Sequence, residues 1–169
     1  GSAVSVSRNY CLASIGSDTG GSVRIPAAWT NLVGLKTTHG SIDLTGVLKL
    51  CPSFDTLGPI GKTVEDTQLL FHAMSGRKSR KLRKIKPENC NFLIVKNMFF
   101  DDIDTEIEDS FNIVIEKIAK SGATIKYKSL SEIDSAFEIS KTVFPAEAYG
   151  IWHHEIEKNP EKMFAPIRE

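Results

Sequence analysis

Residues 16–26 read Gly-Ser-Asp-Thr-Gly-Gly-Ser-Val-Arg-Ile-Pro and directly follow the apolar run 11–15. Glycine lets the backbone approach a ligand closely and adopt positive φ angles. Successive N–H groups in such a loop can therefore point at one anion or oxyanion. Ser22 places a hydroxyl directly beside those donors. The combination suits an oxyanion that forms next to a hydroxyl, but a Gly-rich turn that merely joins a strand to a short helix carries the same pattern.

The segment 16–28 resembles the core of the amidase signature family. The similarity continues through Asn-Leu-Val-Gly-Leu-Lys at 31–36, Ser-Phe-Asp-Thr-Leu-Gly-Pro-Ile at 53–60 and Thr-Val-Glu-Asp at 63–66, in the family's order and spacing. The strong part covers about residues 1–76, and the remainder is similar only through element order and the segment 146–149. The resemblance implies an α/β fold, with a mixed central β-sheet covered by helices on both faces.

The resemblance also implies roles for the residues of this loop. The nucleophile would be Ser22, and the oxyanion hole would be formed by the backbone N–H groups of Thr19, Gly20 and Gly21, with that of Ser22 as a further candidate. Asp18 and Arg24 would form an ion pair that holds the loop and would not transfer protons. Ser17 would either donate a hydrogen bond within the loop or serve as an ordinary turn serine.

The family's proton relay has no counterpart in these residues. It uses a Ser–cis-Ser–Lys triad, in which the relay serine and the lysine precede the nucleophile by more residues than lie between Gly1 and Ser22. Ser2, Ser5 and Ser7 are too close to Ser22 for that spacing. A cis peptide at a non-proline residue also needs surroundings that enforce it. The expectation is a fragment truncated at both ends, inactive by itself, of an enzyme that cleaves linear amides.

Two members of the family are candidates for this protein, and they differ in their substrates. Stand-alone amidases often carry a segment similar to residues 50–59, which favours hydrolysis of a small-molecule amide. The alternative is the A subunit of glutamyl-tRNA(Gln) amidotransferase, which would imply partner subunits, tRNA and release of ammonia from glutamine. That subunit usually has Tyr-Gly-Arg where this chain has Thr-His-Gly-Ser at 38–41. A third interpretation is a non-catalytic binding module with a purely structural Gly-rich loop.

Composition is that of an ordinary globular domain. Hydrophobic residues make up 41% and charged residues 25%, and the formal net charge is zero, so nothing favours nucleic acid or membrane as a partner of the whole chain. The sequence contains no apolar run of about 18 residues and no signal-peptide pattern. Cys11, Cys51 and Cys90 are far apart and odd in number, which favours reduced thiols in a cytoplasmic protein over a disulfide or metal site. No metal and no cofactor are expected.

The expected organisation is a fragment of a single domain in three parts. Residues 1–76 form the signature core, with a helix over 3–10, a strand over 11–15 that Gly16 ends, and a short helix from about Ser22. Thr63 is expected to cap a helix whose apolar face is formed by Val64, Leu69, Leu70 and Ala73. Residues 77–90 form a basic linker, with seven basic residues in 77–86, which favours a solvated surface loop over a site for phosphates.

Residues 91–169 are expected to form a strand–helix–strand–helix portion. The strands lie over 92–95 and 123–127 and pair in parallel on a wider sheet. The helix between them begins with a cluster of acidic residues, which its dipole favours there. Its buried stripe is formed by Ile107, Phe111, Val114, Ile115 and Ile118. A further helix begins near Ser131 and is kinked or restarted at Pro145.

Overall fold

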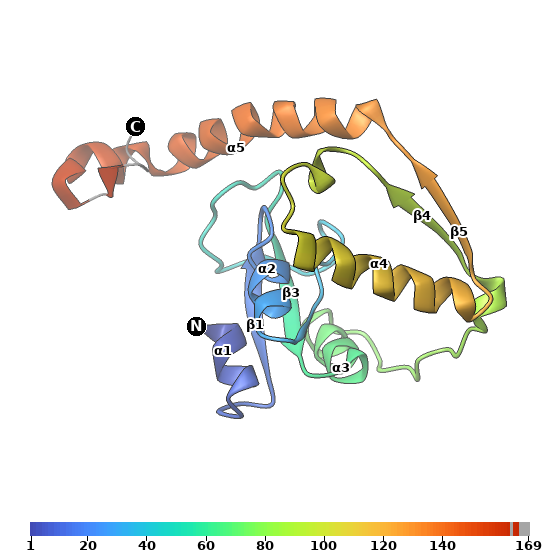
Figure 1. Ribbon diagram of the computed structural model, residues 1–169. Coiled ribbons are helices and arrows are strands. Elements are labelled where there is room, and N and C mark those ends of the chain that lie inside the picture. Colours follow the sequence, from blue (N-terminus) through green and yellow to red (C-terminus); the bar gives the residue numbers. More distant parts are fainter. Residues whose placement is uncertain (163, 166–169) are drawn as a thin grey trace. The chain divides into compact units, whose positions relative to one another are not determined.

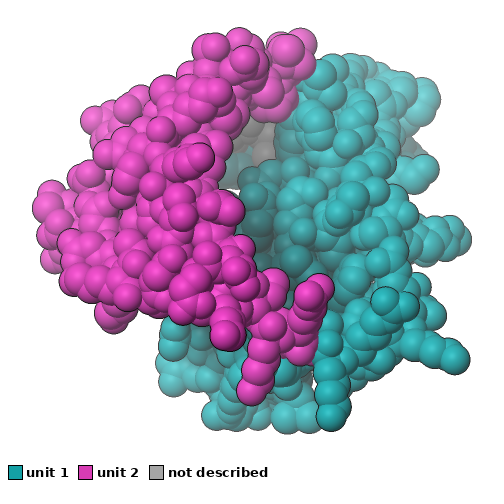
Figure 2. All heavy atoms as spheres, turned by 90° about the vertical axis from the view of Figure 1, so that its right-hand side faces the viewer, with its two compact units in different colours: residues 1–81, 143–169 teal, residues 82–142 magenta. Residues whose placement is uncertain are grey.

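The computed structural model describes residues 1–162, 164 and 165. The chain forms two compact units: unit 1 holds Gly1–Lys81 and Val143–Glu169, and unit 2 holds Leu82–Thr142 (Figure 2). One boundary lies inside the expected linker 77–90. Residues from 143 onward group with the signature core and not with 91–142, because Glu147 and Trp152 hydrogen-bond to residues 49–53.

Unit 1 is built on a three-stranded antiparallel sheet in the order β1-β3-β2, and Figure 1 shows β1 beside β3. Its strands are β1 (Ala13–Asp18), β2 (Val33–Gly34) and β3 (Thr56–Gly61). The expectation that Gly16 ends the first strand is wrong. Gly16 pairs with Gly58 inside the ladder, and the strand continues until Asp18 pairs with Thr56. The sheet therefore delivers Asp18 and the Gly-rich loop directly from a strand end.

Three short helices accompany this sheet: α1 (Ser2–Ser7), α2 (Arg24–Trp29) and α3 (Val64–Met74). The small core cluster joins α1, the start of α2 and β3. Its members are Ala3, Val23, Ala27 and Ile60, with Leu32 packed against them. α2 begins two residues after Ser22 and contains Pro26 in its first turn, where the missing N–H costs the helix no internal hydrogen bond. The core thus fixes the end of the Gly-rich loop at Val23, and the pairing of β1 with β3 fixes its start.

The cap of α3 confirms the sequence prediction, but its apolar face does not. The Thr63 hydroxyl oxygen accepts a hydrogen bond from the Asp66 amide at 3.0 Å. Val64 and Leu69 are more than half exposed, and the buried residue of the helix is Thr67. A short sheet offers little apolar surface to this helix. Thr67 packs instead against Gly61, and its hydroxyl bonds to the Thr63 carbonyl oxygen at 2.8 Å.

Gly58 is expected to tolerate no side chain. A Cβ atom at this position would lie 2.1 Å from the Leu35 carbonyl oxygen, which is backbone and cannot rotate away. We expect Gly58→Ala to lower the free energy of unfolding by about 3 kcal/mol, through strain of the kind that overpacking produces. Urea unfolding measures this. Gly150→Ala is the matched control: nothing lies within 4 Å of its Cβ, and alanine in that helix should stabilise slightly.

Unit 2 contains a strand–helix–strand motif, as the sequence predicted. β4 (Asn91–Val95) and β5 (Thr124–Lys128) pair in parallel, and α4 (Thr105–Lys120) connects them. Within the described residues this sheet has two strands, so the expected wider sheet is not formed by this part of the chain. Single 3₁₀ turns lie at Pro87–Asn89 and Met98–Phe100 in this unit, and at Pro160–Lys162 in unit 1. The α/β class is confirmed, with one antiparallel and one parallel sheet.

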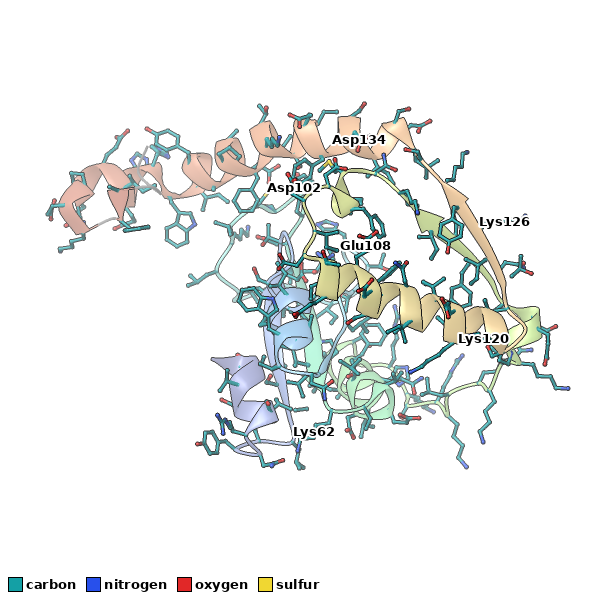
Figure 3. The ribbon with its side chains drawn as sticks, in the orientation of Figure 1. Lys62, Asp102, Glu108, Lys120, Lys126 and Asp134 are labelled. Carbon is teal, nitrogen blue, oxygen red and sulfur yellow. The ribbon has the colours of Figure 1, made fainter. Side chains whose placement is uncertain are left out.

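The expected buried stripe of α4 is only partly buried. Ile115 is 9% exposed, whereas Ile107 and Val114 are 57% and 50% exposed, because a two-stranded sheet covers little of the helix. Ile107 and Phe111 instead line an apolar cavity of about 420 Å³ with residues of β4. The charges follow the helix dipole as expected: Glu108 lies near the start of α4 and Lys120 at its end (Figure 3).

The last long helix, α5 (Ser131–Lys158), begins in unit 2 and continues in unit 1. It runs through Pro145 without interruption, so the expected restart there is wrong. At its start, the side-chain amide nitrogen of Asn97 donates to Asp134 of α5 at 2.7 Å and to the Leu130 carbonyl oxygen at 2.8 Å. The basic segment 77–86 is an exposed loop, as predicted. None of the helices in the described residues is long and apolar enough to cross a bilayer.

Candidate functional site

Asp18 is the buried anchor of the Gly-rich loop. Its side chain is 0% exposed and lies at the end of β1. The Arg24 guanidinium donates to both carboxylate oxygens at 3.0 Å, in the bidentate geometry that suits this pair. The same carboxylate also accepts from the amides of Val23 and Arg24 at 3.3 and 3.4 Å. The loop between residues 18 and 24 is therefore closed by four hydrogen bonds to one side chain.

The charge state of Asp18 follows from this environment. Burial by itself would raise the pKa of the carboxyl, but the hydrogen bond and charge of Arg24, together with the Val23 amide, hold that pKa below its usual value. The hydrogen bond that Arg24 donates to Asp18 in turn raises the pKa of Arg24. Asp18 is consequently a fixed anion with its oxygens occupied, which suits a structural role and not proton transfer.

The turn inside this closed loop leaves backbone donors free. Among the described residues, the amides of Gly20, Gly21 and Ser22 donate no hydrogen bond to another protein group. Gly21 has a φ of +139°, and a Cβ there would lie 2.6 Å from the Ile25 side chain, so the conformation requires glycine. The side chain of Thr19, in contrast, has a partner, because its hydroxyl donates to Asp55 at 2.5 Å.

Ser22 is exposed and lines two cavities of unit 1. The larger, of about 430 Å³, is bordered by α1, β1 and α2 and includes Trp29 and Ile60. The smaller, of about 70 Å³, has a mainly apolar wall formed by residues 44–50 and also includes Thr19 and Asp55. Ser17 lines both cavities as well. The structure thus brings Ser17, Thr19 and Ser22 to one hollow surface. The buried Asp18 and the half-exposed Arg24 hold the loop in place.

Sequence reasoning gave no role to two carboxylates near this surface. Asp55 lies within the segment 53–60, which resembles the family. Its oxygens accept from the Thr19 hydroxyl, from the Leu50 amide at 2.9 Å and from the Cys51 amide at 3.0 Å. Glu147 lay within the weakly similar segment 146–149, and it bonds to Ser53 and Cys51 from 94 and 96 residues away. A pairing at that separation leaves no local pattern in a single sequence.

The described part of the chain contains no cluster of side chains that could bind a metal ion. No group of three or more His, Cys, Asp or Glu side chains lies close enough together to hold an ion there. The three cysteines are free, and Cys51 is fully buried. The polar groups that do converge are those of the Gly-rich loop, and their chemistry is that of a hydroxyl beside unpaired amide donors.

Comparisons with known proteins agree on one family. A family profile described as Amidase matches residues 1–168. The chain is 33% identical over 161 residues to the A subunit of the glutamyl-tRNA(Gln) amidotransferase of Gloeothece citriformis, and the match covers 88% of this chain and 33% of that protein. The chain thus spans about a third of the length of the curated relative.

Two solved structures have the same fold over nearly the whole chain. A crystal structure of an amidase matches with a TM-score of 0.90 at 30% identity, covering 99% of this chain and 38% of the other. The A subunit of the Thermotoga maritima glutamyl-tRNA(Gln) amidotransferase matches with a TM-score of 0.78 at 26% identity, covering 95% and 39%.

Proposed function

The chain belongs to the amidase family, and from this premise we propose that it carries the nucleophile of an enzyme that hydrolyses carboxamide C–N bonds. Ser22 is the proposed nucleophile. The amides of Thr19, Gly20 and Gly21 are the proposed oxyanion hole, and Asp18, Arg24 and Ser17 support the loop. The preferred substrate class is a linear small-molecule amide. A cytoplasmic location stays a prediction.

One observation carries this proposal. The exposed Ser22 side chain lines two cavities and directly follows amides that have no partner in the described structure. Unpaired donors fixed beside a hydroxyl are the arrangement that stabilises charge developing on a carbonyl oxygen under attack. The free amides of Gly20 and Gly21 immediately precede this serine, and the unpaired amide of Ser22 belongs to a residue that lines both cavities.

The reaction would proceed in two steps. The Ser22 oxygen attacks the amide carbonyl carbon, and the negative charge on the carbonyl oxygen is met by the loop amides. The C–N bond then breaks, the amine leaves with a proton, and the acyl group remains on Ser22 as an ester. Water attacks the ester and releases the acid. We assign the proton relay to residues outside these 169, and we expect this chain by itself to be inactive.

The second candidate is the A subunit of a glutamyl-tRNA(Gln) amidotransferase, in which glutamine is the amide and ammonia passes to a tRNA-bound acceptor. The 33% identity to a protein of that name favours it. The segment 38–41 favours the stand-alone amidase, because it differs from the Tyr-Gly-Arg that the A subunit usually has there. In the structure, Nε2 of His39 in that segment lies 2.8 Å from the Pro52 carbonyl oxygen. Glutaminase activity that requires added partner subunits would decide for the second candidate, and hydrolysis of simple amides without partners for the first.

The non-catalytic interpretation makes a different prediction. A binding module would keep its affinity for a protein or RNA partner after Ser22→Ala, and the full-length protein would hydrolyse no amide. Binding measured by titration calorimetry for the wild type and Ser22→Ala, beside an amide hydrolysis assay, separates this interpretation from both enzymatic ones.

Hydroxylamine capture tests the covalent step of the proposal. If an acyl-enzyme forms, added hydroxylamine takes the acyl group from Ser22 and yields a hydroxamate in competition with water. We expect the ratio of hydroxamate to acid from the full-length protein to be the same for an anilide and a simple alkyl amide of one acyl group, because both pass through one ester. A ratio that changes with the leaving amine contradicts a common acyl-enzyme.

A further inference from the structure

Glu147 of α5 holds a loop of unit 1 through three hydrogen bonds. One carboxylate oxygen accepts from the Ser53 amide at 3.0 Å and from the Cys51 thiol at 3.2 Å. The other accepts from the Ser53 hydroxyl. Five residues further along the same helix, the Trp152 indole N–H donates to the Lys49 carbonyl oxygen at 2.8 Å. α5 therefore grips the segment 49–53 at both ends.

The gripped segment leads directly to Asp55. One Asp55 oxygen accepts from the amides of Leu50 and Cys51, and the other accepts from the Thr19 hydroxyl in the Gly-rich loop. Asp55 is only 7% exposed, so these contacts are made away from solvent. A continuous set of hydrogen bonds thus runs from Glu147 through the segment 49–55 to the residue that begins the proposed oxyanion hole.

The same segment forms a wall beside the proposed nucleophile. The small cavity that Ser22 lines is bordered by Leu44, Val47, Leu48, Lys49 and Leu50. These wall residues belong to no helix or strand themselves, because 41–55 is irregular throughout. Their positions depend on contacts made elsewhere in the segment: His39 bonds to the Pro52 carbonyl oxygen, and Glu147, Trp152 and Asp55 bond to residues 49–53.

The charge states of the contact suit a permanent link. The hydrogen bonds from Ser53 hold the pKa of Glu147 below its usual value, so it stays an acceptor near neutral pH. Burial, and then the hydrogen bond to Glu147, raise the pKa of the Cys51 thiol to about 11, so the thiol stays protonated as a donor. The buried thiol is therefore a structural donor and not a nucleophile.

We propose that Glu147 is a positioning residue that sets the apolar wall 44–50 of the small cavity that Ser22 lines. The inference rests on the proposed function of Ser22 for its catalytic consequence. Wall residues contact bound substrate alike before and during the reaction, so a loosened wall weakens binding more than it slows the chemical step. Glu147 acts on the reaction only through these residues.

The test compares Glu147→Ala, Glu147→Gln and Glu155→Gln in the full-length protein. Glutamine keeps one oxygen for the Ser53 amide, whereas alanine removes all three acceptor contacts. Glu155 lies on the same helix, is exposed, and accepts no side-chain hydrogen bond in the described residues, so its glutamine variant controls for the lost charge. We expect Glu147→Ala to raise KM about tenfold with kcat within about threefold, Glu147→Gln to recover most of this, and Glu155→Gln to match the wild type.

Hydrogen exchange of the segment 49–54 gives a readout that needs no activity. We expect faster exchange in Glu147→Ala, intermediate exchange in Glu147→Gln, and no change in Glu155→Gln. If Glu147→Ala does not fold, Ser53→Ala serves, because it removes only the hydroxyl contact and should raise KM by a smaller factor of about three.

The outcomes separate the two proposals. An unchanged KM in Glu147→Ala, or a loss confined to kcat, overturns the positioning role even where exchange quickens. A wild-type protein that hydrolyses no amide overturns the proposed function instead. Exchange that is unchanged in Glu147→Ala then also overturns the role of Glu147.

Discussion

Ser22→Ala is expected to lower kcat for amide hydrolysis by about 10⁶-fold in the full-length protein, leaving only the catalysis that binding and the loop amides supply. The expected effect is large because the substitution removes the oxygen atom that would form the proposed ester. The next hydroxyl along the loop, that of Thr19, is already committed to Asp55. Product formation under substrate saturation measures the loss.

Two controls show that the loss comes from the hydroxyl. Ser75→Ala removes a serine at the end of α3 that lines neither cavity, and it should leave kcat unchanged. Ser22→Ala itself should unfold at the same urea concentration as the wild type, because the Ser22 side chain is exposed and bonds to no described residue. Activity within tenfold of the wild type in Ser22→Ala would show that another group is the nucleophile.

Asp18→Asn is expected to have the largest effect on stability among the substitutions of the site. Asparagine offers one acceptor oxygen and two N–H donors, so it cannot serve both Arg24 and the loop amides. Arg24 is half exposed and recovers water, but the Val23 amide is left buried without its acceptor. We expect a loss of about 3 kcal/mol in the free energy of unfolding, and a loop too loose for catalysis.

Urea unfolding with an unchanged m-value measures this loss. Asp43→Asn is the matched control, because Asp43 lies in an exposed loop and bonds only to Thr45. It should shift the midpoint far less than Asp18→Asn. Equal shifts for the two variants would show that the Asp18 contacts contribute little to the fold.

The Asp18 carboxyl makes the stability of the folded protein fall at acidic pH. The pKa of Asp18 is lower in the folded protein than its ordinary value of 3.8, so ionisation of this carboxyl favours the folded state. Its contribution is fully present above the ordinary value and is lost as pH falls through the lower, folded one. Asp18→Asn should therefore flatten the fall in stability of the wild type below pH 3.8.

The sequence predicted the ion pair of Asp18 with Arg24, because both residues lie within one short stretch. Asp18, Arg24 and Ser22 are spaced so closely that any turn between strand and helix brings them together. The continuation of β1 through Gly16 was not predicted, because a glycine in a sequence commonly indicates the end of a strand. Only the pairing with Gly58 across the sheet shows that the strand continues, and one sequence does not give that pairing. The capping of α3 by Thr63 was predicted because the whole contact lies within the four residues 63–66.

Long-range features could not be predicted from one chain. The contact of Glu147 with Ser53 joins residues 94 apart, and nothing near either residue indicates the other. The apolar pattern of α4 indicated a helix correctly, but a pattern gives the face that is apolar and not how much of that face is covered. Ile107 and Val114 remain exposed in the described structure because only a two-stranded sheet lies against α4.

In the proposed reaction Ser22 takes an acyl group, and a fluorophosphonate that phosphonylates activated serines tests this most directly. The full-length protein is treated, digested and mapped by mass spectrometry, beside Ser22→Ala. We predict one adduct, on Ser22, that is absent from Ser22→Ala. An adduct on a different residue, or labelling that survives Ser22→Ala, would contradict the account.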